Sequence, residues 1–83
     1  MPATTMDIDN LVHMANRIGE FFQSMPDRQE ASREIVQHLR KFWEPRMRRA
    51  LLAHVDAGGT GLMPIVQDAL GEHRLALLLQ STA

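Results

Sequence analysis

Apolar side chains recur at spacings of three and four residues in four segments of this 83-residue chain, and proline or glycine separates each segment from the next. This spacing places the apolar side chains along one face of an α-helix. No segment alternates with a period of two over a useful length, as a half-buried strand would, and the chain has no tyrosine. The sequence therefore predicts an all-α fold, a small bundle of three to four short helices.

Local signals give the approximate bounds of these helices. The expected helices span residues 6–25, 27–43, 45–57 and 63–79, with a glycine loop at 58–62. Asp7 or Asp9, and then Asp27, are suitable N-caps, and Pro45 suits the first position of the third helix. The glycines of the loop can supply a left-handed end to that helix. A chain of this length is expected to form one helical domain over residues 1–83.

Composition excludes several classes of protein. The chain has no cysteine, which excludes a disulfide framework, a thiolate metal site and a thiol nucleophile. No apolar run approaches the ~20 residues that a membrane-spanning helix requires, and the N-terminus does not resemble a secretory signal. We expect a soluble, cytoplasmic protein without a membrane partner.

The histidines and acids do not form a recognisable metal or catalytic motif. No two of the four histidines, His13, His38, His54 and His73, stand three or four residues apart, the spacing that places two ligands on one helix face. His38 and His54 lie beside the apolar stripes, where a half-buried, hydrogen-bonded role is expected. The acids suit caps and solvated faces, and the loop GGTGLMP lacks the lysine of a phosphate-binding loop. We predict no catalytic, cofactor-binding or metal-binding residue, and no activity for this chain alone.

Charge is unevenly distributed along the chain although the net charge is −1. Residues 1–34 contain six acids and three bases, whereas residues 40–49, RKFWEPRMRR, contain five bases and one acid. Cations in the first turn of a helix are disfavoured by about a few tenths of a kcal/mol each, so local helix energetics do not explain the arginines after Pro45. Arginine and tryptophan are enriched at interface hot spots. The segment predicts a partner-binding surface made of Arg40, Lys41, Phe42, Trp43, Arg46, Met47, Arg48 and Arg49.

Other roles for these cations remain open. They can form salt bridges with acids of the first two helices, stand in solvent without consequence, or cover apolar surface with their methylene stems. Nucleic acid is an alternative partner, because arginines at a helix start can reach phosphates. The pI near 6.4 argues against it, so we expect no nucleic-acid binding. A free-standing helical homodimer is a further alternative.

The C-terminal stretch LALLLQSTA, residues 75–83, places four leucines close to a chain end. Chain ends are usually polar and solvated. One interpretation is that the stretch continues the fourth helix and packs on the core. The other is that it forms an apolar strip covered by another subunit.

Two segments carry a family resemblance. LVHMANRIGEFF, residues 11–22, and FWEPRMRRALLAHV, residues 42–55, resemble the delta subunit of bacterial NAD-dependent formate dehydrogenases, and the likeness extends over roughly residues 6–74. These enzymes are cytoplasmic complexes that convert formate and NAD+ to carbon dioxide and NADH. Their large catalytic subunit holds a molybdenum or tungsten pterin and iron-sulfur clusters, and other subunits carry flavin and bind NAD. The resemblance implies a non-catalytic accessory subunit, without a cofactor of its own, that docks on the large subunit and aids assembly, stability or cofactor maturation.

Overall fold

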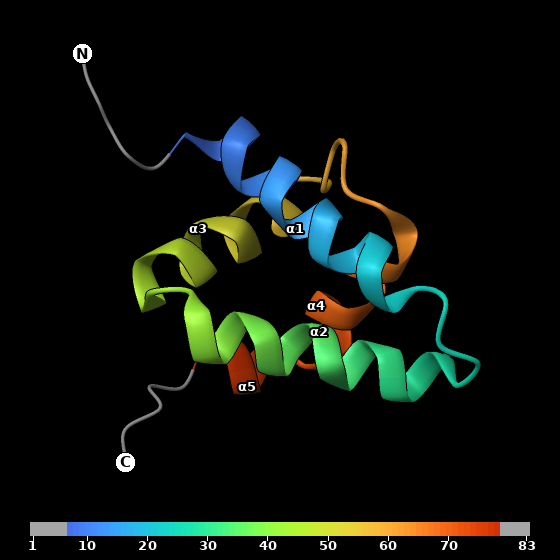
Figure 1. Ribbon diagram of the computed structural model, residues 1–83. Helices are drawn as coiled ribbons and strands as arrows, with labels where there is room; N and C mark the ends of the chain where they lie inside the picture. The colour runs from blue at the N-terminus through green and yellow to red at the C-terminus, as the bar shows by residue number, and fades with distance from the viewer. Residues whose placement is uncertain (1–6, 79–83) are drawn as a thin grey trace.

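The computed structural model describes residues 7–78, which contain five helices and no strand. The helices are α1 (Ile8–Phe22), α2 (Arg28–Phe42), α3 (Pro45–Asp56), α4 (Pro64–Glu72) and α5 (Arg74–Leu78), as labelled in Figure 1. The predicted all-α class is confirmed. Within the described residues, none of the helices has the length and apolar character that crossing a membrane requires.

The first two helices begin at the aspartates that the sequence indicates as caps. The Asp7 carboxylate accepts a hydrogen bond from the Asp9 N–H at 3.1 Å. The Asp27 carboxylate accepts from the N–H groups of Gln29 and Glu30 at 3.0 and 3.3 Å. Helices α3 and α4 instead begin with proline, whose missing N–H would have no intrahelical partner at that position. In each of these four helices, residues at the first turn therefore determine where the helix begins.

Helix α3 ends in a glycine cap, as the sequence predicts. Gly58 has a φ of 120°, in the region that favours glycine. The Gly58 N–H donates to the Val55 carbonyl at 3.0 Å, and the Gly59 N–H donates to the His54 carbonyl at 2.9 Å. These two bonds form a Schellman motif and satisfy carbonyl groups at the end of the helix.

Side chains from neighbouring helices fix the loop between α3 and α4. The Asn16 side chain of α1 donates to the Gly61 carbonyl at 2.9 Å and accepts from the Met63 N–H at 2.9 Å. The His54 ring nitrogen Nε2 lies 2.8 Å from the Thr60 carbonyl oxygen. The glycine loop, which the sequence predicts to be a flexible connection and a helix cap, therefore joins α3 to α4 as a hydrogen-bonded turn.

The fourth predicted helix, residues 63–79, is divided in the structure. Helix α4 ends at Glu72, and His73 leaves the helical conformation with φ −115° and ψ 32°. The expectation of one continuous helix is therefore wrong. The break turns α5 onto α2 and α3, buries Leu77, and allows Arg74 to donate two hydrogen bonds to the Asp56 carboxylate at 2.8 and 2.7 Å. No proline marks this boundary, so tertiary contacts determine it.

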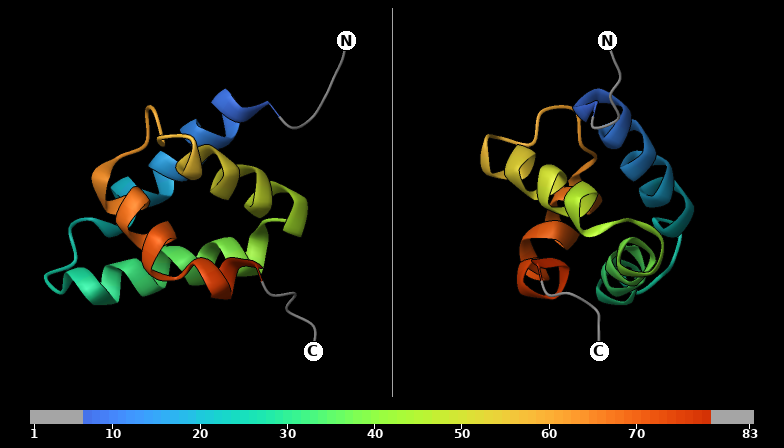
Figure 2. Two further views of the ribbon diagram at one scale, coloured as in Figure 1. Left: turned by 180° about the vertical axis from the view of Figure 1, so that it is seen from behind. Right: turned by 90° about the vertical axis from the view of Figure 1, so that its left-hand side faces the viewer.

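The helices surround one apolar core. In Figure 1, α1 and α2 lie in front, α4 and α5 lie behind them, and α3 closes the left side; Figure 2 shows the same arrangement from behind and from that side. All five helices contribute to the core. Its buried apolar residues are Leu11, Ala15, Ala31, Ile35, Val36, Leu39, Trp43, Leu51, Leu52, Leu62, Ile65, Val66, Ala69, Leu70 and Leu77.

Helices α1 and α4 come closest at Gly19, which is buried. A Cβ atom at this position would lie 2.5 Å from Cγ2 of Val66, whose side chain has no exposed surface. Because valine is stiff at χ1 and the interior is close-packed, Val66 has little freedom to move away. Glycine is required here by the contact between the helices rather than by a turn.

We expect Gly19→Ala to lower the free energy of unfolding by roughly 1–3 kcal/mol, because overpacking outweighs the gain in helix propensity. Gly71→Ala in α4 is the matched control, since no atom lies within 4 Å of its Cβ position. That substitution is expected to stabilise the protein by roughly 0.4–1 kcal/mol. Urea unfolding of the full chain, followed by circular dichroism, measures both. If both alanines stabilised the protein, the close approach of α1 to α4 would be wrong.

Candidate docking surface

The eight residues predicted to bind a partner meet at the junction of α2 and α3, which we call the basic corner (residues 40–49). The structure divides them into three groups. Trp43 and Arg48 are buried, with 6% and 2% of their surface exposed. Arg40 and Met47 are half-buried, and the exposed members are Lys41, Phe42, Arg46 and Arg49. The sequence-based expectation that Trp43 and Arg48 face outward is therefore wrong.

Arg48 is turned inward to bind the end of α2. Its Nη1 donates to the Arg40 carbonyl at 3.0 Å and to the Trp43 carbonyl at 3.3 Å. These carbonyls belong to the C-terminal end of α2, where the helix dipole favours a cation. The dipole of α3 disfavours an arginine near its start, but the end of the preceding helix supplies the compensation. Arg48 thus has a structural role that helix propensity alone does not reveal.

The basic corner carries positive charge without a matching acid in the part of the chain that the structure describes. Burial, and then the nearby guanidinium groups of Arg40 and Arg49, lowers the pKa of Arg48. The Nε atoms of Arg40 and Arg48 are buried and have no hydrogen-bond partner among residues 7–78. Ion pairs among residues 7–78 lie elsewhere: Arg28 with Asp68, Arg74 with Asp56, and His73 beside Glu72. Salt bridges to acids of the first two helices therefore do not account for the cations.

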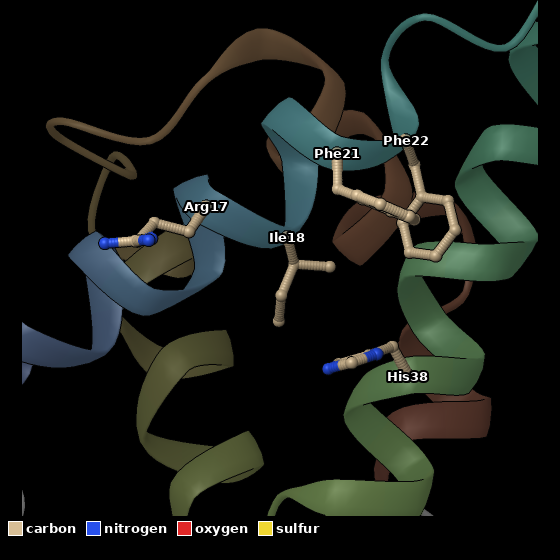
Figure 3. A pocket seen from close by; sticks show the side chains of 5 residues that line it. All are labelled: Arg17, Ile18, Phe21, Phe22 and His38. Atoms are coloured by element: carbon tan, nitrogen blue, oxygen red, sulfur yellow. The ribbon is translucent and has the colours of Figure 1, made fainter.

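A second exposed surface lies between α1 and α2. An open hollow of about 310 Å³, here called the α1–α2 groove, is lined by Arg17, Ile18, Phe21, Phe22 and His38. In Figure 3, Ile18 points from α1 toward His38 on α2, and Arg17 lies at the opposite end of the hollow from the two phenylalanines. The rings of Phe21 and Phe22 meet edge to face, with centroids 4.9 Å apart.

Phe42 joins the α1–α2 groove to the basic corner. Its ring centroid lies 4.7 Å from that of His38, which lines the groove, while the residue itself belongs to the corner. Phe42 is 70% exposed, and Phe21 at the other end of the groove is 73% exposed. One signal for this surface is visible in the sequence, because Phe21 widens the apolar stripe of the first helix beyond what one core-facing side needs. His38 is half-buried, as expected, but within the described residues its ring contacts Phe42 and makes no side-chain hydrogen bond.

The possible metal ligands and the C-terminal leucines are the remaining candidates from the sequence. Among the described residues, no group of three or more His, Cys, Asp or Glu side chains could hold a metal ion. In the C-terminal stretch, Leu77 is buried, as the core-packing interpretation expects. Leu75 is 74% exposed and Leu78 is 39% exposed, so both remain available as an apolar strip. Residues 79–83, the rest of that stretch, lie outside the described part of the chain.

Comparison with known proteins gives one match. The family model described as NADH-dependent formate dehydrogenase delta subunit FdsD matches residues 10–70. This range contains α2, α3 and most of α1 and α4, and therefore both the basic corner and the α1–α2 groove. No curated protein and no solved structure matches the chain.

Proposed function

The chain belongs to the family of NADH-dependent formate dehydrogenase delta subunits, and on this premise we propose that it is a non-catalytic accessory subunit of such an enzyme. It binds the large catalytic subunit of a cytoplasmic complex and aids assembly, stability or cofactor maturation. The pterin-bound molybdenum or tungsten, the iron-sulfur clusters, the flavin and the NAD implied by the family resemblance belong to other subunits. This chain supplies a binding surface rather than reacting groups.

The observation that carries this proposal is the unpaired charge of the basic corner. Arg46 and Arg49 are exposed, and neither forms an ion pair with a described residue. Beneath them, the buried guanidinium of Arg48 forms no ion pair with any acid of residues 7–78. Arginine forks match carboxylates geometrically, and charged patches on partners are commonly complementary. The corner is therefore suited to an acidic surface on the catalytic subunit.

The structure changes which residues are assigned to direct contact. The exposed side chains of Lys41, Phe42, Arg46 and Arg49 are the contact residues in this proposal. Trp43 and Arg48 act from the interior, because they pack and hydrogen-bond the two helix ends that present these side chains. Contact thus requires both the exposed cations and the buried pair that fixes the corner.

Reversing the two exposed arginines tests the contact. The double variant Arg46→Glu, Arg49→Glu is expected to weaken binding to the catalytic subunit by at least about tenfold, since like charges would then face the acidic partner. Both positions are exposed, so the helical circular dichroism spectrum should stay unchanged. Co-purification with the tagged catalytic subunit, followed by a binding titration, gives the readout.

The control for this experiment is Arg28→Glu, Arg33→Glu at the opposite end of α2. Both residues are exposed, and the change in charge is the same. This variant should retain binding. If the two double variants lost binding equally, net charge rather than the corner would be responsible; if neither lost binding, the corner is not the contact. Metal and pterin content of the complex assembled with and without the chain separates cofactor maturation from simple stabilisation.

A further inference from the structure

The α1–α2 groove is an apolar surface that residues 7–78 leave uncovered. Ile18 and Phe22 are half-buried at its base, whereas Phe21 is 73% exposed at its edge. Phe42, which is 70% exposed, extends the apolar surface past His38 toward the basic corner. A contiguous exposed apolar surface of this kind marks an interaction site more often than scattered single residues do. The lining side chains come from the two helices, which flank the hollow (Figure 3).

The polar side chains that line the groove come from two residues. Among residues 7–78, Arg17 and His38 are the polar lining residues, and no carboxylate lines the groove. Arg17 forms no ion pair with another residue of the range 7–78. Exposed residues of both signs stand one helical turn from His38 on α2, Glu34 before it and Lys41 beyond it. An occupant that fills the hollow therefore needs apolar side chains, and a carboxylate within reach of Arg17 is electrostatically favoured.

These properties select among the possible occupants. A second copy of this chain, packed groove to groove, would bring no carboxylate to Arg17 from its own groove, because none is among the described residues that line it. Nucleic acid would supply anions but few apolar groups for the space around Ile18. An amphipathic helix satisfies both requirements, because side chains at i, i+3 and i+4 lie on one face and an acid can stand beside them.

We propose that the α1–α2 groove binds an acidic amphipathic helix of a larger subunit of the enzyme complex. Apolar side chains of that helix occupy the space between Phe21 and His38, and a carboxylate pairs with Arg17. The identity of the partner rests on the proposed function, whereas the chemistry of the segment follows from the groove. The groove and the basic corner then form one continuous contact surface, joined at Phe42.

Two single variants test the groove in the full chain. Phe21→Ala removes the exposed ring, and Arg17→Glu reverses the charge at the opposite end. Each is expected to weaken binding to the complex assembled without this chain by at least about tenfold, because hot spots are typically aromatic or arginine residues. The matched control for Arg17→Glu is Arg33→Glu, an exposed cation elsewhere on α2, which should bind as the unaltered chain does.

Photocross-linking identifies the occupant. With p-benzoyl-phenylalanine in place of Phe21, the cross-linked peptide should come from a larger subunit and contain apolar residues at helical spacing beside Asp or Glu. A cross-link only to a second copy of this chain, or to a segment without an acid, would overturn the proposal. So would full binding by the Phe21 and Arg17 variants while Arg46→Glu, Arg49→Glu loses it, a result that leaves the proposed function intact. If the unaltered chain does not bind the complex, both proposals are wrong.

Discussion

Trp43→Ala is expected to lower the free energy of unfolding by about 3–5 kcal/mol, the range for removing a large aromatic side chain from a core. Only 6% of Trp43 is exposed, and it packs within the cluster that joins all five helices. Small domains have a total stability of about 5–15 kcal/mol, so the variant should lose a large share of it and unfold at a much lower urea concentration. Urea unfolding of the full chain, followed by circular dichroism, measures the change without depending on tryptophan fluorescence.

The neighbouring residue supplies the control. Phe42 is also aromatic but 70% exposed, so Phe42→Ala should change stability by no more than about 0.5 kcal/mol. That variant should instead weaken binding, because Phe42 joins the groove to the basic corner. If Trp43→Ala folded normally and lost only its partner, the indole would be a contact residue and its burial in the core would be wrong.

Arg48→Ala is the second large effect, with an expected loss of about 1.5–3 kcal/mol, the usual contribution of hydrogen bonds that involve a charged group. Truncation leaves the carbonyls of Arg40 and Trp43 without their donor and opens a cavity between α2 and α3. Relief of repulsion from Arg40 and Arg49 offsets part of this loss. Thermal and urea unfolding of the full chain provide the measurement.

Two further variants test whether the loss of stability in Arg48→Ala comes from its hydrogen bonds to α2. Arg46→Ala, an exposed arginine of the same helix, should change stability by about 0.5 kcal/mol or less. Arg48→Lys keeps the charge but loses the planar fork, and is expected to fall between Arg46→Ala and Arg48→Ala. Equal stability of Arg48→Ala and Arg46→Ala would show that the two hydrogen bonds to α2 contribute nothing.

The features that could be predicted from the sequence are those fixed within a few residues. Asp7 and Asp27 cap the helices that follow them, and Gly58 ends α3 in the left-handed region. Each of these helix ends depends on a backbone group that lies within a few residues of the capping residue. The apolar periodicity likewise identifies the core faces, because it reflects burial of one side of each helix.

The features that could not be predicted depend on how the helices meet. Arg48 turns inward because the end of α2 lies beside the start of α3, and its residue type alone suggested a solvent-facing cation. Tryptophan is common both in protein cores and at interfaces, so the residue type of Trp43 does not distinguish burial from contact with a partner. No proline stands at the break at His73, which depends instead on the packing of α5 against α2 and α3. The α1–α2 groove required the relative placement of Phe21 and His38, which lie on different helices.

The close contact between Gly19 and Val66 has a consequence on the other side of α1. Cγ2 of Val66 occupies the space that a Cβ at position 19 would take, so α1 can lie this close to α4 only with glycine there. Helix α4 also packs on α2, the other wall of the groove, so this contact helps to hold the two walls at their separation. A preorganised cleft loses little conformational freedom on association, so more of its contact energy remains as affinity. In the proposed complex, Gly19 would therefore affect affinity through the packing of α1 rather than by touching the partner.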